Sequence, residues 1–192
     1  MRNAQMTPAA LREKPILAWH FVAIRDGVPT LQSYDKTTDR DALVVAPGYI
    51  YTTDEPKIGC CASGLHWSRD VRDALSYAPQ AERLAVCRVL AWGEVDERAD
   101  KGASRHREVL WVADATDALR WWALDCAWRV EQYAKDPRVA ACNQASEDYL
   151  RGQIMRDELW RARDAADAAA ERKWQSDALT RRMLALGPRG AK

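Results

Sequence analysis

The sequence predicts an α+β protein, with a small, mostly antiparallel sheet and one or two helices followed by an all-helical C-terminal half. Two observations predict this class. Segments rich in β-branched and aromatic residues recur between Gly- and Asp-containing turns up to residue 113. From Asp114 onward the apolar residues follow helical spacing, and no strand pattern remains. The predicted organisation is a flexible arm (1–15), an α+β domain (16–113) and a helical region (114–192).

The predicted sheet begins with residues 16–24, which combine Trp, Phe, Val and Ile. Asp26-Gly27 suits a tight turn because both residues tolerate a positive φ angle, so a second strand is expected at 28–32. A Gly-bearing turn leads to a short strand end that carries His66 and Trp67. Further extended segments are expected within 42–53, at 83–95 and at 107–113.

Helices are predicted from caps and from apolar spacing. Ser68 stands where an N-cap belongs, in front of a helix expected at 69–78. Asp114 is expected to cap the next helix, which ends at Asp136-Pro137 because the residue before a proline disfavours helical geometry. Two further helices are predicted at 138–151 and at 153–185.

Composition and charge narrow the range of functions. The 29 basic and 28 acidic side chains give a net charge of +1, so no long-range attraction draws the chain to nucleic acid or to an anionic membrane. No apolar run approaches the roughly 18 residues of a membrane-spanning helix, and residues 1–15 lack the apolar run of a secretory signal. The five cysteines have no regular spacing, which favours free thiols in a reducing compartment. We therefore expect a cytoplasmic protein whose partners are neither nucleic acid nor membrane.

Four short patterns follow one another along the chain: Ala18-Trp19-His20-Phe21, Cys61-x-x-Gly64-Leu65-His66-x-Ser68, Asp73-Ala-Leu-x-Tyr77-Ala78 and Asp100-Lys101-x-Ala103-x-Arg105. In these patterns and their order, residues 16–113 resemble a domain of unknown function that recurs in small bacteriophage proteins. The resemblance implies a phage or prophage origin, and therefore the cytoplasm of the host cell. It implies no particular activity.

Two places in the sequence are candidate binding sites. His66, Trp67 and Ser68 stand at a loop-strand-helix joint, where a histidine can bind a ligand or move a proton near neutral pH. The alternative is that His66 hydrogen-bonds the loop backbone and locks the joint. Lys101 and Arg105 belong to a local basic cluster that could hold a phosphate or an acidic partner. The alternative there is a solvated loop.

The candidate catalytic residues are His20, Tyr51 and Glu108. A histidine on the first strand, a tyrosine on a later element and a glutamate on a late strand are similar to the His-Tyr-Glu arrangement of ADP-ribosyltransferases. That resemblance implies NAD as the cofactor, with the histidine holding the nicotinamide-side ribose and the tyrosine stacking on nicotinamide. The glutamate would stabilise the developing oxocarbenium ion. Tyr49 and Tyr77 are alternatives for the tyrosine, and Glu94 is an alternative for the glutamate.

Cys60, Cys61, His66 and Cys87 carry the right donor atoms for zinc, but the paired C-x2-C spacing of structural zinc sites is missing. No metal site and no cofactor are therefore expected. The leading functional prediction is a non-enzymatic phage or prophage accessory protein that binds a protein partner, such as a host or defence component. One alternative is an ADP-ribosyltransferase-like enzyme. The other is a virion-associated or self-assembling protein that forms homo-oligomers through its C-terminal helices.

Overall fold

The computed structural model describes residues 2–3, 14–31, 43–133, 137–153 and 172–187. The chain folds as two compact units. The first comprises Met1–Ala115 together with the end of the chain from Met183, and the second comprises Thr116–Arg182.

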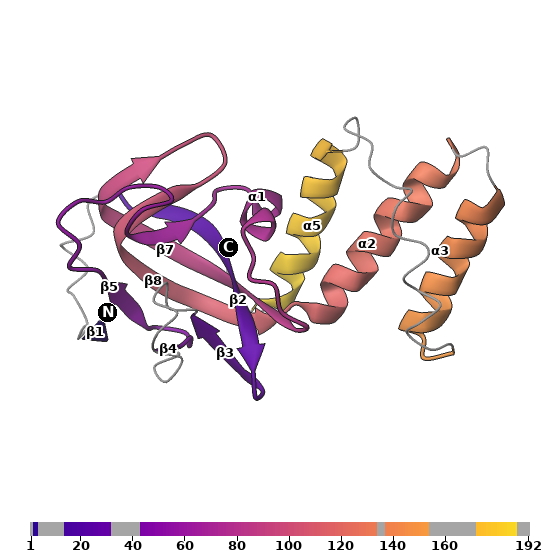
Figure 1. Cartoon of the computed structure of the whole chain (residues 1–192), viewed down its shortest axis with the longest axis horizontal. Helices are drawn as coiled ribbons and strands as arrows, with labels where there is room; N and C mark the ends of the chain where they lie inside the picture. The colour runs from indigo at the N-terminus through magenta and orange to yellow at the C-terminus, as the bar shows by residue number, and fades with distance from the viewer. Residues whose placement is uncertain (1, 4–13, 32–42, 134–136, 154–171, 188–192) are drawn as a thin grey trace. The chain divides into compact units, whose positions relative to one another are not determined.

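The first unit contains an eight-stranded antiparallel sheet (Figure 1). Its strands are β1 (Arg2–Asn3), β2 (Ile16–Arg25), β3 (Val28–Leu31), β4 (Leu43–Val44), β5 (Ile50–Thr52), β6 (Leu65–Trp67), β7 (Leu84–Glu97) and β8 (Gly102–Asp114). Their order across the sheet is β1-β5-β8-β7-β2-β3-β4, and β6 pairs with β8 outside this path.

The sheet curls because β6 joins two distant strands. β5 pairs with residues 106–108 of β8, and β6 pairs with residues 102–104 of the same strand. Directly after β6, Ser68 exchanges two backbone hydrogen bonds with Trp19 of β2, at 2.8 and 3.0 Å. The end of β6 is therefore held against both β8 and β2, which bends the sheet into an incomplete barrel.

An apolar core occupies one face of this sheet. Its side chains are at most 3% exposed: Ala18, Val22, Val45, Tyr51, Leu65, Trp67, Ala85, Cys87, Val89, Ala91 and Val109. His20 lies on the same face because it alternates with Ala18 and Val22 along β2. Trp19 and Phe21 point to the opposite face, as the alternation predicts, and the Trp19 ring meets Trp111 edge-on at 5.9 Å.

The predicted fold class is wrong in the size of the sheet and in the C-terminal half. The sheet has eight strands, and β7 and β8 span 14 and 13 residues. β8 lies in the second half of the chain, so that half is not all-helical. Near the C-terminus Gly187 packs on the Trp111 ring, since a Cβ there would lie 2.9 Å from it. Residues 102–106 have the small and polar side chains typical of a loop. They nevertheless form a strand, because their backbone is hydrogen-bonded to β6 and β7.

Four helices are described: α1 (Val71–Ser76), α2 (Thr116–Glu131), α3 (Pro137–Leu150) and α5 (Arg172–Leu186). α2 and α3 lie where the sequence predicts them. The predicted helix at 153–185 is seen as α5 at its C-terminal end, and residues 154–171 lie outside the described part of the chain. None of these helices, as far as they are described, has both the length and the apolarity to cross a membrane.

Two further predictions about local structure need correction. The N-cap of α1 is Asp70, whose side chain accepts the N–H of Arg72 at 2.7 Å, and not Ser68. Ser68 does not cap the helix because its backbone is hydrogen-bonded to Trp19 and its side chain is buried. Part of the predicted flexible arm is ordered, since Arg2–Asn3 form β1 against β5. Residues 4–13 of that arm lie outside the described residues.

Candidate functional site

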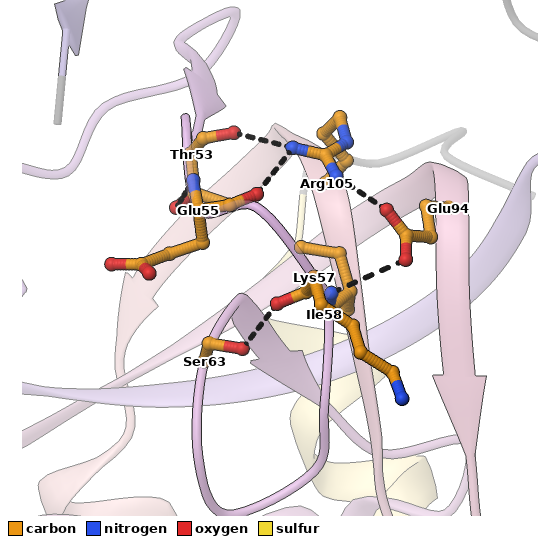
Figure 2. A network of polar contacts seen from close by, with 7 residues as sticks. All are labelled: Thr53, Glu55, Lys57, Ile58, Ser63, Glu94 and Arg105. Carbon is orange, nitrogen blue, oxygen red and sulfur yellow. Dashed lines mark hydrogen bonds and ion pairs between the residues drawn. The ribbon is translucent and has the colours of Figure 1, made fainter.

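The loop between β5 and β6 is held to the sheet by charged side chains (Figure 2). Arg105 of β8 donates to the carbonyl oxygens of Thr53 and Glu55 at 3.3 and 2.9 Å. The same guanidinium forms an ion pair with Glu94 of β7. Glu94 in turn accepts the backbone N–H of Ile58 at 3.3 Å, and Arg105 holds the pKa of this carboxyl below its usual value. Arg105 thus connects two strands to the loop.

The next part of the loop is fixed in the same way. Asp96 of β7 accepts the N–H of Cys60 at 2.8 Å, and the Cys60 thiol donates to the Asp96 carbonyl at 3.1 Å. A tight turn follows, in which Gly59 and Ser63 exchange backbone hydrogen bonds. The Ser63 hydroxyl donates to the carbonyl of Lys57 at 2.6 Å (Figure 2). The loop therefore has few backbone positions free to move.

His66 locks this loop to the following strand. Its Nε2 accepts the backbone N–H of Cys61 at 3.1 Å, which requires a neutral ring protonated on Nδ1. Burial, then the charges of Arg107 and Lys101, lower the pKa of His66 and keep the ring neutral. Cys61 has a φ angle of 67°, in the left-handed region. His66 thus makes the backbone hydrogen bond that one of its two predicted roles requires, and its role in binding stays a prediction.

An exposed polar cluster lies beside the locked loop. We call it the Tyr77–Lys101 cluster, and it consists of Cys61, Tyr77, Asp100 and Lys101. Tyr77 is 50% exposed at the end of α1, and its hydroxyl donates to the Asp100 carboxylate. The Lys101 ammonium lies 4.4 Å from the centre of the Tyr77 ring, a cation–π distance. Hydrogen bonds to Cys61 and Tyr77 raise the pKa of Lys101. Three separate segments of the sequence meet here.

The Tyr77–Lys101 cluster gathers several polar groups at the surface. An exposed thiol, a phenol and an ammonium group are close together, but the nearby imidazole is committed to the backbone. The Nε2 atom of His66 accepts the N–H of Cys61 and so cannot accept the proton of its thiol. A half-exposed tyrosine beside a cation presents both a large apolar surface and hydrogen-bond donors.

The other predicted binding residues have structural roles. Trp67 is 2% exposed, and its ring covers Gly102, where a Cβ would lie 2.3 Å from the indole. Ser68 is also 2% exposed and is held by Trp19. Arg105 is engaged by the loop, as described above. Only Lys101 among these residues belongs to the exposed cluster.

The catalytic candidates do not meet in one cleft. Tyr51 pairs across strands with Arg107 and is fully buried, and its hydroxyl donates to the Val44 carbonyl at 2.6 Å. His20 pairs with Cys87 on the same face, where burial is the main cause of its lowered pKa. Glu108 follows Arg107 along β8 and therefore projects from the other face. The structure brings His20 and Tyr51 to the core face and leaves Glu108 on the opposite one.

The four possible zinc ligands do not gather their donor atoms at one point. Cys60 is bonded to Asp96, Cys87 lies in the core opposite His20, and Cys61 is exposed. Within the described ranges, no three His, Cys, Asp or Glu side chains are grouped so as to hold a metal ion.

The buried Arg107 is not among the residues that the sequence singles out. Its side chain is 2% exposed and donates to the carbonyl of His66. A signal was present, since Arg107 stands two positions before Val109 and strand alternation places both on one face.

The first unit thus combines a curled antiparallel sheet, a loop held by side-chain hydrogen bonds and an exposed polar cluster. Residues 35–121 match the model of a family described as a domain of unknown function (DUF7666). The prediction of a domain of unknown function is confirmed, and the matched range includes the whole Tyr77–Lys101 cluster. No curated protein and no solved structure matches the chain.

Proposed function

We propose that this protein is a non-enzymatic accessory protein, encoded by a phage or prophage, that binds a protein partner through the Tyr77–Lys101 cluster. The supporting observation is the pairing of a half-exposed Tyr77 with Lys101 on a scaffold fixed by side-chain hydrogen bonds. Tyrosines are enriched among the residues that dominate binding energy at interfaces. A rigid scaffold adds affinity because less conformational entropy is lost on binding. The phage origin is supported by the sequence resemblance.

This proposal is favoured over the ADP-ribosyltransferase alternative by geometry. Tyr51 is 0% exposed, so its ring has no free face for nicotinamide. Glu108 projects from the other side of β8. A ligand that binds only the folded state raises the melting temperature. We therefore expect NAD to leave the melting temperature unchanged, and a clear rise would favour the enzyme.

A site-specific photo-crosslinker tests the proposed binding surface. Tyr77 is replaced by a photoreactive phenylalanine analogue in the full chain, which is expressed in the host cell and irradiated. The matched control carries the analogue at Tyr133, which is 72% exposed in the second unit. We expect one defined protein to be crosslinked from position 77 and not from position 133.

A second substitution makes the result specific to the cluster. Lys101→Ala in the Tyr77 analogue should abolish the crosslink, whereas Lys57→Ala on the pinned loop should leave it unchanged. Excess unlabelled wild-type protein should compete for the partner. The same products from both photoreactive positions, or a crosslink insensitive to Lys101→Ala, would contradict the proposal.

Self-assembly is distinguished from partner binding by mass. A homo-oligomer would give a crosslink between two copies of this chain, and light scattering would show a multiple of the 21.7 kDa monomer mass. The proposal expects a different protein in the crosslinked product.

A further inference from the structure

Arg107 is a buried cation that lacks a counter-charge among the described residues. The side chain is 2% exposed, and the hydrogen bond that it makes goes to the neutral carbonyl of His66. No described carboxylate forms an ion pair with it. Burial is the main cause that lowers its pKa to about 10, so the guanidinium is still charged at neutral pH. A buried charge without a counter-charge is strongly destabilising.

The groups around Arg107 do not neutralise it. Tyr51 and Cys87 are the nearby acidic groups on the core face, and burial raises the pKa of each to about 12. Both are therefore uncharged at neutral pH. His20 and His66 are the other titratable neighbours, and either would add positive charge on protonation. The Tyr51 ring, 6.0 Å from the guanidinium carbon, gives only a weak cation–π attraction.

Arg107 has one donor left over. Its Nε atom is buried and has no hydrogen-bond partner among the described residues. Buried donors are nearly always satisfied by protein, by water or by an ion. A water molecule would accept the hydrogen bond but would leave the charge of the guanidinium uncompensated.

We propose that the protein binds a monoatomic halide, such as chloride, at Nε of Arg107 inside the curled sheet. The surroundings limit the size of the ligand, because Tyr51, Val89 and Val109 on the core face are at most 1% exposed. A nucleotide or a peptide is excluded there, and only a ligand of about the size of one water molecule is compatible with such burial. The bound halide supplies the negative charge that the described side chains do not supply. This site is separate in chemistry from the exposed Tyr77–Lys101 cluster.

The direct test observes the Nε–H group itself. The full chain is labelled with ¹⁵N-arginine and titrated with sodium chloride against sodium gluconate at equal ionic strength. We expect the Arg107 Nε–H resonance, assigned with Arg107→Lys, to shift and saturate with chloride, and bromide to compete. The resonance of Arg105 serves as the internal control and should not shift. An Arg107 resonance that is the same in chloride and gluconate would overturn the proposal.

A second measurement uses stability. At a chloride concentration about ten times the dissociation constant, the folding equilibrium constant should rise roughly tenfold through linkage. Arg107→Met should lose this chloride dependence, and Arg105→Met, the matched control on the same strand, should keep it. Equal stabilisation by chloride and gluconate, or retention of the effect in Arg107→Met, would exclude the site. If Arg107→Met fails to fold, the resonance titration of the wild-type protein still decides.

Discussion

Arg105 and Arg107 stand two positions apart on β8 and have opposite surroundings. Arg105 is partly exposed, forms an ion pair with Glu94 and donates to two carbonyls of the loop. Arg107 is buried against Tyr51 and donates to one carbonyl. The first connects the loop to the sheet at the surface. The second carries a charge into the core, where no described carboxylate balances it.

The difference shows that two neighbouring stretches of β8 are stabilised by different interactions. We call the stretch at Arg105, which contacts the loop, the loop side, and the stretch at Arg107, which packs in the core, the core side. On the loop side, exposed charges hold backbone groups, and water screens each interaction, so each contributes little alone. On the core side, close packing and desolvation determine the stability, so a small change in side-chain volume lowers the free energy of unfolding more. Substitutions of the same kind should therefore have larger effects on the core side.

Two glycine substitutions give the largest expected contrast. Gly102→Ala would place a Cβ 2.3 Å from the Trp67 ring, which is itself buried and cannot move away. We expect a loss of about 3 kcal/mol in the free energy of unfolding, the upper range for overpacking. Gly59→Ala on the loop meets only ordinary contacts at 3.8 Å and beyond, and should change stability by less than about 0.5 kcal/mol.

Urea unfolding measures both variants under the same conditions. Equal losses in Gly102→Ala and Gly59→Ala would break the distinction between the two sides of β8. A large loss confined to Gly59→Ala would reverse it.

The two arginines give the next contrast. Arg107→Ala leaves a cavity and an unsatisfied His66 carbonyl, and should cost about 3 kcal/mol. Arg107→Met fills the space and removes the buried charge, so it should be more stable than Arg107→Ala by about 2 kcal/mol. Arg105→Met should cost no more than about 1 kcal/mol because its contacts are partly exposed. Thermal unfolding at a fixed chloride concentration measures the order of stability of the three variants. The prediction is wrong if Arg105→Met is the least stable.

The N-cap of α1, the helix that follows β6, gives a contrast with a smaller expected effect. Asp70→Ala should lower stability by about 1 kcal/mol, since it removes the acceptor of the Arg72 N–H. Ser68→Ala should have less effect, because Ser68 is held through its backbone. Chemical denaturation of both variants measures the difference. A larger loss in Ser68→Ala would restore Ser68 as the cap and contradict the structure.

Local signals in the sequence predicted local features. Strand alternation placed His20 opposite Trp19 and Phe21, as found. Asp26-Gly27 forms the predicted turn, with φ angles of 50° and 80°. The alternative that His66 bonds the loop backbone was also available, because a histidine next to a Gly-rich turn is within reach of its amides. Each of these depends on residues close together in the chain.

Features that depend on distant pairing were not predictable. Alternation with Val109 indicates which face of β8 carries Arg107, but the depth of its burial depends on the pairing of β5 and β6 with β8, which no local pattern encodes. The Tyr77–Lys101 cluster likewise requires α1 and the β7–β8 turn to meet. The last strand was predicted to begin at residue 107, but its small and polar residues 102–106 already belong to β8.

The smallest expected effect concerns the ion pair on the loop side. The folded pKa of Glu94 is lowered, first by the hydrogen bond from Arg105 and then by the N–H of Ile58. A lowered pKa means that the carboxylate stabilises the loop at pH values above its unfolded pKa, near 4.5, and that this contribution is lost as pH falls through the folded value. Protection of the Ile58 amide against hydrogen exchange, corrected for intrinsic rate, should therefore decrease on acidification below that range.

Two internal controls connect this decrease with Glu94. The Thr53 amide donates to the carbonyl of Arg105 at 3.1 Å, so its acceptor does not titrate and its protection should change less. Glu94→Gln removes the titrating group, so Ile58 protection in this variant should be lower at neutral pH and independent of pH in the acidic range. If Ile58 and Thr53 lose protection together in the wild-type protein, the loop opens as a unit. Individual surface carboxylates would then not control it, and the loop side of β8 would be as cooperative as the core side.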